Sequence, residues 1–263
     1  MKIIIVSQSD PFYIPLFFSK FSELMADVKN IQVDGVIIQQ GLGKKSKISL
    51  ARQMFQFYGL YHFITQSIKY CMRKCTGKLN SLGLLGKSFS IEYFVKKSGW
   101  DIIDYTNVNS SDFVDYVKEN DIDLIVSVAA SQIFKKEILE APKEGCINIH
   151  NAPLPDYRGM LPNFWQMYHG EEYSVMTIHE MVEELDKGRI ILQKKTKIEP
   201  DMSLDELIKK TKQKNAEALI QVLEMFGKGE VEYRDLPEKE GSYFSFPLKK
   251  DVAEFRRRGG RLF

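Results

Sequence analysis

The chain has 263 residues, of which 44% are hydrophobic and 27% are charged. This length predicts one large domain with an appendage, and the composition is that of an ordinary globular protein. Such a chain can bury a core without disulfides, so a disordered tail, a collagen-like fibre and a disulfide-stapled miniprotein are excluded. The net charge of +2 lacks the basic excess of a dedicated nucleic-acid binder.

Cysteine usage and the first residues predict the compartment. An odd, small number of cysteines (Cys71, Cys75 and Cys146) fits a reducing cytoplasm without a disulfide framework. No further Cys or His stands at metal-ligand spacing from Cys71 and Cys75, so we expect no structural zinc. The apolar start at 2–6 is too short for a signal-peptide core or a membrane span. We therefore expect a cytoplasmic protein.

Strands and helices are expected to alternate along most of the chain. The first are a short β-branched run at 2–6, helix-spaced apolar residues at 11–26 and a second strand at 31–38. This opening predicts an open, mostly parallel α/β sheet covered by helices. Later strands are expected at 102–105, 123–128, 147–149, 175–181 and 190–198, and helices at 91–97, 110–120, 134–139 and 203–226. Ser203 and Glu206 stand in capping-box positions of the last of these helices, and a charged, helix-like tail follows.

The stretch 41–90 interrupts this alternation. A turn-rich link at 41–46 leads into a long helical pattern at 49–73 that is rich in Phe, Tyr and basic residues. Such a pattern is typical of a membrane-surface or nucleic-acid helix, or of an insertion whose aromatic residues pack on the main domain beside a solvated basic edge. We favour the second interpretation and expect 49–75 to be helical and to bind no membrane. The aromatic residues of 52–70 are also candidates for a homodimer face.

One stretch carries a chemical pattern. Asn148 and His150 stand two residues apart at the end of an expected strand, which places both side chains on one face. A loop stiffened by Pro153 and Pro155 follows, at the carboxyl edge where open α/β sheets bind ligands. Asp186 lies further along, in an acidic turn between two expected strands.

Asn, His and Asp that converge at one sheet edge can perform acyl transfer. The amide N–H can stabilise a developing oxyanion, and the imidazole can act as acid or base near neutral pH. The carboxylate can orient the His or accept a proton. The same residue types are also common in structural roles, as a satisfied His at a strand end and as turn-forming Asn and Asp. The pattern alone leaves both interpretations open.

Four blocks of sequence extend this pattern. They are Asn148-Ile149-His150, Leu154-Pro155-Asp156-Tyr157-Arg158-Gly159, Thr177-Ile178-His179 and Leu185-Asp186-Lys187-Gly188. Together they resemble the signature of the N10-formyltetrahydrofolate-dependent formyltransferases, well over 120–200 and not over 41–90. The resemblance implies a Rossmann-like formyltransferase fold with a helical insertion and a small C-terminal appendage. It also implies N10-formyltetrahydrofolate as the formyl donor and no metal.

The resemblance assigns roles to single residues. Asn148, His150 and Asp186 fall on the three catalytic positions of the family, whereas we expect His179 to be structural. The folate-binding segments of the family match Gln132, Ile133, Phe134, Glu183, Glu184 and Leu185. The residues expected to contact the acceptor substrate are Ser9, Asp10, Tyr157 and Arg158.

The branches of this family differ in the amine that accepts the formyl group. Methionyl-tRNA formyltransferases carry a sizeable C-terminal barrel, for which the stretch after Phe226 is too short, and a tRNA binder should be more basic. The loop 7–11 lacks the Gly-rich phosphate-binding pattern of the purine-pathway member. We therefore expect a nucleotide-linked amino sugar as substrate, in surface-glycan or glycoprotein sugar biosynthesis, and no nucleic-acid partner. The alternatives are a methionyl-tRNA formyltransferase and a non-catalytic binding module of the same fold.

The expected organisation has two parts. Residues 1–200 form a formyltransferase catalytic domain that carries the helical insertion at 41–90. Residues 201–263 form a C-terminal helix and a small extension.

Overall fold

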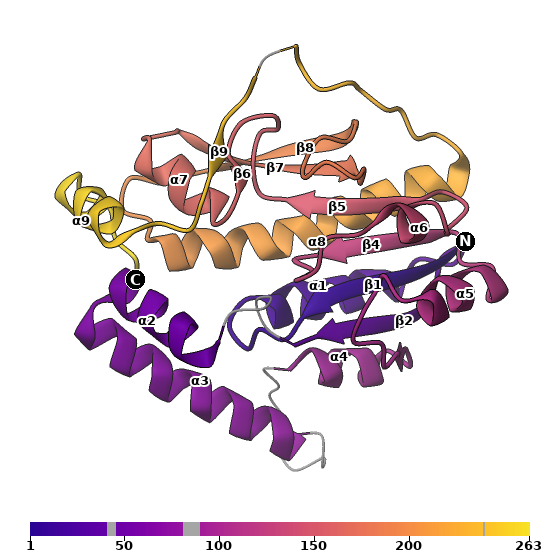
Figure 1. Cartoon of the computed structure of the whole chain (residues 1–263), viewed down its shortest axis with the longest axis horizontal. Helices are drawn as coiled ribbons and strands as arrows, with labels where there is room; N and C mark the ends of the chain where they lie inside the picture. Colours follow the sequence, from indigo (N-terminus) through magenta and orange to yellow (C-terminus); the bar gives the residue numbers. More distant parts are fainter. Residues whose placement is uncertain (41–45, 81–89, 239) are drawn as a thin grey trace.

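The computed structural model describes residues 1–40, 46–80, 90–238 and 240–263, and its centre is a seven-stranded sheet (Figure 1). The strand order is β3-β2-β1-β4-β5-β7-β8. The strands of this sheet are β1 (Lys2–Gln8), β2 (Gln32–Gln39), β3 (Asp101–Ile102), β4 (Leu124–Val128), β5 (Cys146–His150), β7 (Tyr173–Glu180) and β8 (Ile190–Lys197). The helices are α1 (Ile14–Met25), α2 (Lys47–Tyr58), α3 (Leu60–Asn80), α4 (Ile91–Lys97), α5 (Ser111–Glu119), α6 (Lys136–Leu139), α7 (Pro162–Tyr168), α8 (Leu204–Lys228) and α9 (Lys249–Arg257).

Strand β1 lies inside the sheet, between β2 and β4, and is buried on both faces. Ile3 and Ile5 belong to the apolar cluster that α1, α4 and α8 cover, whereas Ile4 and Val6 belong to the cluster under α5 and α6. A continuous Ile/Val run is what such a strand requires, because neither face meets water. The strands β1 to β5 pair in parallel. The predicted open, mostly parallel α/β fold is therefore confirmed.

The last two strands, β7 and β8, are antiparallel to their neighbours. The loop 181–189 between them is short enough to form a hairpin, whereas a parallel return would need a crossover of roughly a dozen residues or more. The pairing sets Glu180, at the end of β7, opposite Ile147 near the start of β5, and the loop 181–189 then brings Asp186 within 3.8 Å of His150 at the end of β5.

Helix α8 begins at the predicted capping box. The Ser203 hydroxyl accepts from the backbone N–H of Glu206, and the Glu206 carboxylate accepts from the backbone N–H of Ser203. Leu219 and Val222 of this helix are fully buried in the cluster that also contains Ile3 and Ile5. Helix α8 therefore shares its apolar core with the sheet. The predicted division of the chain into a catalytic domain (1–200) and a C-terminal part (201–263) stays a prediction.

The insertion is helical, but one predicted helix is two. Gly59 lies between α2 and α3 with a φ of 75° and a ψ of 170°, a positive-φ backbone conformation that glycine adopts readily and that does not continue a helix. The pair lies at one corner of the molecule (Figure 1). Phe57 is buried against Phe164 and Phe246, and Arg73 donates to the backbone carbonyls of residues 11 and 12. The opposite face of α3 is exposed, so the expected packing of this segment on the core holds for its inner side alone.

The C-terminal residues fold back over the loop that follows β5. Strand β9 (Tyr243–Phe244) pairs in parallel with β6 (Arg158–Gly159), and the Trp165 indole N–H donates to the carbonyl of Ser245. These contacts join α7, α9 and the chain end in a third apolar cluster. Residues 41–45 of the predicted link lie outside the described residues. Within the described ranges, no helix is long and apolar enough to cross a membrane.

Candidate active site

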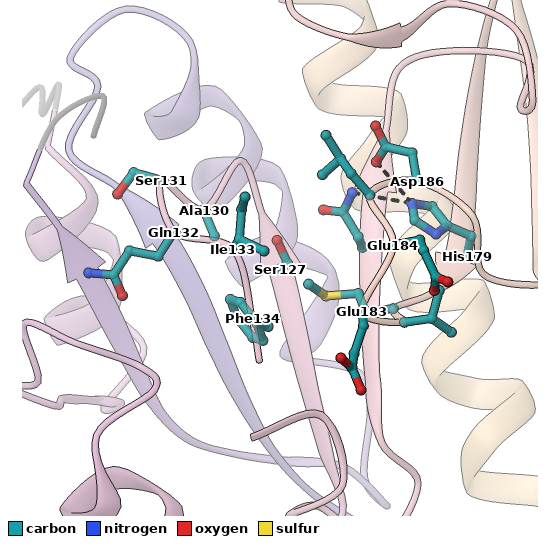
Figure 2. A pocket seen from close by; sticks show the side chains of 14 residues that line it. Ser127, Ala130, Ser131, Gln132, Ile133, Phe134, His179, Glu183, Glu184 and Asp186 are labelled. Atoms are coloured by element: carbon teal, nitrogen blue, oxygen red, sulfur yellow. Dashed lines mark hydrogen bonds and ion pairs between the residues drawn. The ribbon is translucent and has the colours of Figure 1, made fainter. Parts of the chain in front are cut away.

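A cavity of about 160 Å³ lies near the carboxyl ends of β4 and β5 (Figure 2). The loop 130–134 after β4 forms one side, and the loop 181–186 after β7 forms the other. Figure 2 shows Ile133 and Phe134 on the first side and Glu183 and Asp186 on the second. This is the sheet edge at which open α/β folds bind ligands.

The pairing of β5 with β7 places Asn148 directly opposite His179. His179 Nδ1 lies 2.7 Å from the carbonyl oxygen of Glu180, and since a carbonyl only accepts, Nδ1 carries the proton. Burial lowers the pKa of His179 to about 4, although the nearby Asp186 carboxylate raises it, so the ring is neutral at neutral pH. His179 Nε2 therefore accepts from Asn148 Nδ2 at 3.2 Å. This bond uses one amide N–H of Asn148 and leaves the second for a group in the cavity.

Asp186 joins the two histidines. Its Oδ1 atom lies 3.7 Å from His179 Nε2 and 3.8 Å from His150 Nδ1. Its Oδ2 atom accepts from the backbone N–H of Gly159 at 3.4 Å. Asp186 has a φ of 55°, a left-handed conformation that Asp adopts more readily than most residues and that is common at functional sites.

His150 is held by the loop after β5. Its Nε2 atom lies 3.2 Å from the carbonyl oxygen of Tyr157, so Nε2 carries the proton in the neutral ring. Nδ1 then presents a lone pair to Asp186, at a distance too long for a hydrogen bond. A proton that reaches this gap is attracted by both groups. Asn148 and Asp186 line the cavity, and His150 lies beyond Asp186.

The three predicted catalytic residues therefore lie together, and their catalytic role stays a prediction. The sequence assigned His179 a structural role, and the structure adds that it bridges Asn148 and Asp186 within the cavity lining. Only the antiparallel register of β5 and β7 reveals this contact.

All of the predicted folate-binding residues line the cavity, namely Gln132, Ile133, Phe134, Glu183, Glu184 and Leu185. The side-chain amide of Gln132 already has hydrogen-bond partners within the chain, because it accepts from Val108 N and donates to Thr106 O. Ile133 and Leu185 are exposed, so an apolar surface is available on each of the two loops. The binding role of these residues stays a prediction.

The residues predicted to contact the acceptor have other partners in the structure. Asp10 accepts from the backbone N–H groups of residues 12 and 13, and the Ser9 hydroxyl accepts from Lys74 Nζ. Tyr157 donates to Glu171 at 2.6 Å, and Arg158 donates to the carbonyl of Glu240. The buried Nε of Arg158 has no hydrogen-bond partner among the described residues. The structure thus supplies a positioning role for all four, and their contact with substrate stays a prediction.

Helix α8 contributes polar groups that the sequence did not single out. Asn215 Nδ2 donates to Asn151 Oδ1 at 3.0 Å. Asn151 is the residue that directly follows His150 in the chain. One turn away from Asn215, burial lowers the pKa of Lys212, and the Asp10 carboxylate opposes this shift. The two amides therefore lie directly after the end of β5, and Lys212 lies near Asp10, in the loop after β1.

The chain is similar in sequence to curated methionyl-tRNA formyltransferases. Methionyl-tRNA formyltransferase of Thermotoga neapolitana is 26% identical over 208 residues, which are 74% of this chain and 66% of that protein. The methionyl-tRNA formyltransferase of Clostridium acetobutylicum is 37% identical over 149 residues, 56% of this chain and 47% of that protein. The chain thus spans about half to two thirds of the length of these curated relatives.

Solved structures share the fold. A sugar N-formyltransferase from Shewanella sp. FDAARGOS_354 has a TM-score of 0.61 at 20% identity, covering 97% of this chain and 87% of that chain. An N-formyltransferase from Helicobacter canadensis was solved in complex with folinic acid and dTDP-3-aminofucose. It has a TM-score of 0.56 at 15% identity, covering 93% of this chain and 71% of that chain. Residues 84–223, more than half of the chain, match the family model described as Formyl transferase. The chain therefore belongs to the formyl transferase family.

Proposed function

We propose that this chain transfers a formyl group from N10-formyltetrahydrofolate to the amino group of a nucleotide-linked amino sugar. The observation that carries the proposal is the convergence of a free amide N–H and a buried carboxylate in one cavity. Asn148 supplies the first and Asp186 the second. Acyl transfer to an amine needs a donor for the oxyanion and an acceptor for the proton, and both are present.

The residues act in sequence on the two substrates. The neutral amine of the acceptor attacks the formyl carbon, and the carbonyl oxygen becomes an oxyanion. The second N–H of Asn148 donates to it, a contribution of about 3–4 kcal/mol for donors of this type. Asp186 accepts the proton of the attacking amine, and His150 Nδ1 lies 3.8 Å away to share it. The same proton then passes to the nitrogen that leaves the formyl carbon.

The cavity suits the flat ring of a folate. Its sides carry the apolar groups of Ile133, Phe134 and Leu185, and Asn148 and Asp186 supply the polar ones. A planar heteroaromatic ring needs this combination, because its faces are apolar and its edge carries hydrogen-bonding groups. The Helicobacter canadensis enzyme was solved with folinic acid, which supports a folate donor here.

The acceptor is proposed to lie between Lys212 and the catalytic candidates. The ammonium group of Lys212 can pair with a nucleotide phosphate, and the amides of Asn151 and Asn215 can bind sugar or nucleotide groups. The Oδ1 atom of Asn215 is buried and has no hydrogen-bond partner within the described part of the chain. The dTDP-linked amino sugar in the Helicobacter canadensis complex supports this acceptor class.

Methionyl-tRNA is the second candidate acceptor. The names of the curated relatives favour it. A non-catalytic binding module would not need the oxyanion donor that Asn148 provides.

A mass-based screen tests the proposed function. The purified chain is incubated with N10-formyltetrahydrofolate and nucleotide-linked 3-amino and 4-amino sugars, and with methionyl-tRNA in a separate arm. We expect one formyl increment on a sugar nucleotide that is absent with the Asn148→Ala variant. Formylation of methionyl-tRNA alone would show that methionyl-tRNA is the acceptor in place of a sugar nucleotide. No formylation in any arm would refute formyl transfer from N10-formyltetrahydrofolate.

A further inference from the structure

The insertion is strongly basic. Residues 35–91 contain nine Lys and Arg and no Asp or Glu, although the whole chain has a net charge of only +2. The rest of the chain is therefore net negative. A segregation of this kind attracts an anionic partner to one part of the molecule.

The outward face of α3 is apolar. Leu60, Ile64, Ile68 and Met72 follow one another at intervals of four and are 48% to 65% exposed. At roughly 100° per residue, these four side chains span about 120° of the helix surface. Tyr61 projects from the same stripe and is 73% exposed.

Helix α2 carries exposed apolar side chains as well. Its side chains Ile48 and Phe55 are also exposed and lie on one face of the helix with Arg52. We name these residues the hairpin face: Ile48, Phe55, Leu60, Tyr61, Ile64, Ile68 and Met72. Large apolar side chains gathered in this way mark an interaction surface, whereas scattered ones need no explanation.

A basic side chain flanks the apolar stripe of α3. Lys69 is exposed and lies roughly 120° from the middle of the stripe. On the inner side, Arg73 and Lys74 hold α3 to the loop after β1 through the carbonyl of Pro11 and the hydroxyl of Ser9. The stripe therefore points away from the body of the molecule.

We infer that the hairpin face docks on an anionic lipid surface. A helix that lies in a membrane interface buries a broad apolar stripe, and long basic side chains at its edges reach the lipid phosphates. The absence of a membrane-spanning helix in the described ranges fits a surface contact. This inference departs from the sequence-based expectation that the segment binds no membrane, and the experiment below decides between the two.

Two other partners fit the surface less well. A second copy of the chain could bury the apolar stripe, but it would offer the basic side chains Lys69 and Arg52 the same basic surface and no anionic partner. Nucleic acid is bound by basic grooves and aromatic stacking platforms, whereas the middle of this stripe is aliphatic, with Leu60, Ile64 and Ile68. Lipid satisfies both the aliphatic middle and the basic edges.

Co-sedimentation with vesicles tests the inference on the full chain. We expect capture by phosphatidylglycerol-containing vesicles, little capture by pure phosphatidylcholine, and release as salt rises. The Ile64→Ser/Ile68→Ser variant should bind at least about tenfold less, because the buried stripe loses its middle. Lys69→Gln should bind about fivefold less at low salt, the effect of one basic residue near such a surface. The control Leu248→Ser removes an equally exposed apolar side chain on α9 and should bind like the parent.

Circular dichroism and the melting temperature establish that the variants are folded, and the readout involves no formyl transfer. No capture of the parent chain by anionic vesicles at low salt would overturn the inference. Equal capture of the parent and of the Ile64→Ser/Ile68→Ser variant would overturn it too. If vesicles capture nothing, a dimer that the Ile64→Ser/Ile68→Ser variant abolishes would assign the surface to a second copy of the chain. Binding to total tRNA without capture by vesicles would assign it to nucleic acid, and either result would overturn the inference.

Discussion

At the scale of single residues, the orientation of one amide is decisive. Asn148 can present an N–H to the cavity only because the lone pair of a neutral imidazole fixes its amide group. His179 remains neutral because it is buried, and Glu180 fixes its tautomer through a backbone carbonyl. We therefore regard His179 as a positioning residue for the proposed reaction.

Removing Asn148 or Asp186 should affect turnover far more than binding. Asn148→Ala and Asp186→Ala should each lower kcat about a hundredfold or more and change KM little, because both groups act mainly in the transition state. The double variant Asn148→Ala/His179→Ala should cost much less than the product of the two single effects, since His179 acts through Asn148. Steady-state kinetics on folded variants measures this. Near-native turnover of either single variant would make that residue structural.

The buried neutral histidine should make stability depend on pH. The pKa of His179 is lowered from 6.5 to about 4 in the folded chain. Between these values the unfolded chain binds a proton that the folded chain does not, so stability falls as pH falls through this window. The contribution is at most about 1.4 kcal/mol per pH unit. His179→Gln should flatten the curve of unfolding free energy against pH, whereas the control His62→Gln, at a half-buried position of α3, should not. Identical curves for the parent and His179→Gln would contradict this.

At the scale of elements, the loop between β7 and β8 positions Asp186. Gly188 ends this loop, and a Cβ atom there would overlap the backbone carbonyl of Glu180. Gly188→Ala should therefore displace the loop, lowering both the melting temperature and kcat, with a loss of about 1–3 kcal/mol in stability.

Gly227 of α8 is the matched control. A Cβ there meets no atom within 4 Å, so Gly227→Ala should leave activity unchanged and stabilise the helix slightly. Thermal melts and kinetics of both variants check this. A Gly188→Ala variant as stable and active as Gly227→Ala would show that the loop adapts without cost.

Local sequence signals were sufficient for much of the fold. The Ile/Val run of β1 and the Ser203–Glu206 capping box act within a few neighbouring residues, and both were predicted. The break at Gly59 was missed because the apolar pattern continues across it. The pairing of β6 with β9 joins residues far apart in the chain, and no local pattern predicts it.

The candidate site divides in the same way. The motif blocks around Asn148 and Asp186 led to the cavity, because each block lies at the end of a strand or in a loop. The bridging contact of His179 requires the register of two antiparallel strands. The neighbourhood of Lys212 and Asn215 requires the packing of α8 near β1 and β5, which no motif encodes.

At the scale of the whole molecule, charge is divided between two regions. The insertion is basic, and the cavity is lined by Glu183, Glu184 and Asp186. An anionic acceptor therefore needs a positive group near the site, and Lys212, near Asp10 in the loop after β1, is the candidate that we propose.

Lys212→Met should raise the KM for a nucleotide-linked acceptor by about tenfold, since it removes one charge-assisted contact to phosphate, and should change kcat little. The exposed Lys228 at the end of the same helix gives the control Lys228→Met, which should leave KM unchanged. Kinetics at several nucleotide-sugar concentrations measures the split. A fall in kcat with an unchanged KM would place Lys212 elsewhere in the reaction.

A competition assay tests the central claim most directly. One reaction holds the chain, a limiting amount of N10-formyltetrahydrofolate, methionyl-tRNA and an equimolar set of nucleotide-linked amino sugars at physiological salt. Mass spectrometry then locates the formyl group. We predict that it is found on the amine of a sugar nucleotide, and that Asp186→Ala abolishes the product. A formyl group found on methionyl-tRNA alone would contradict the proposed acceptor.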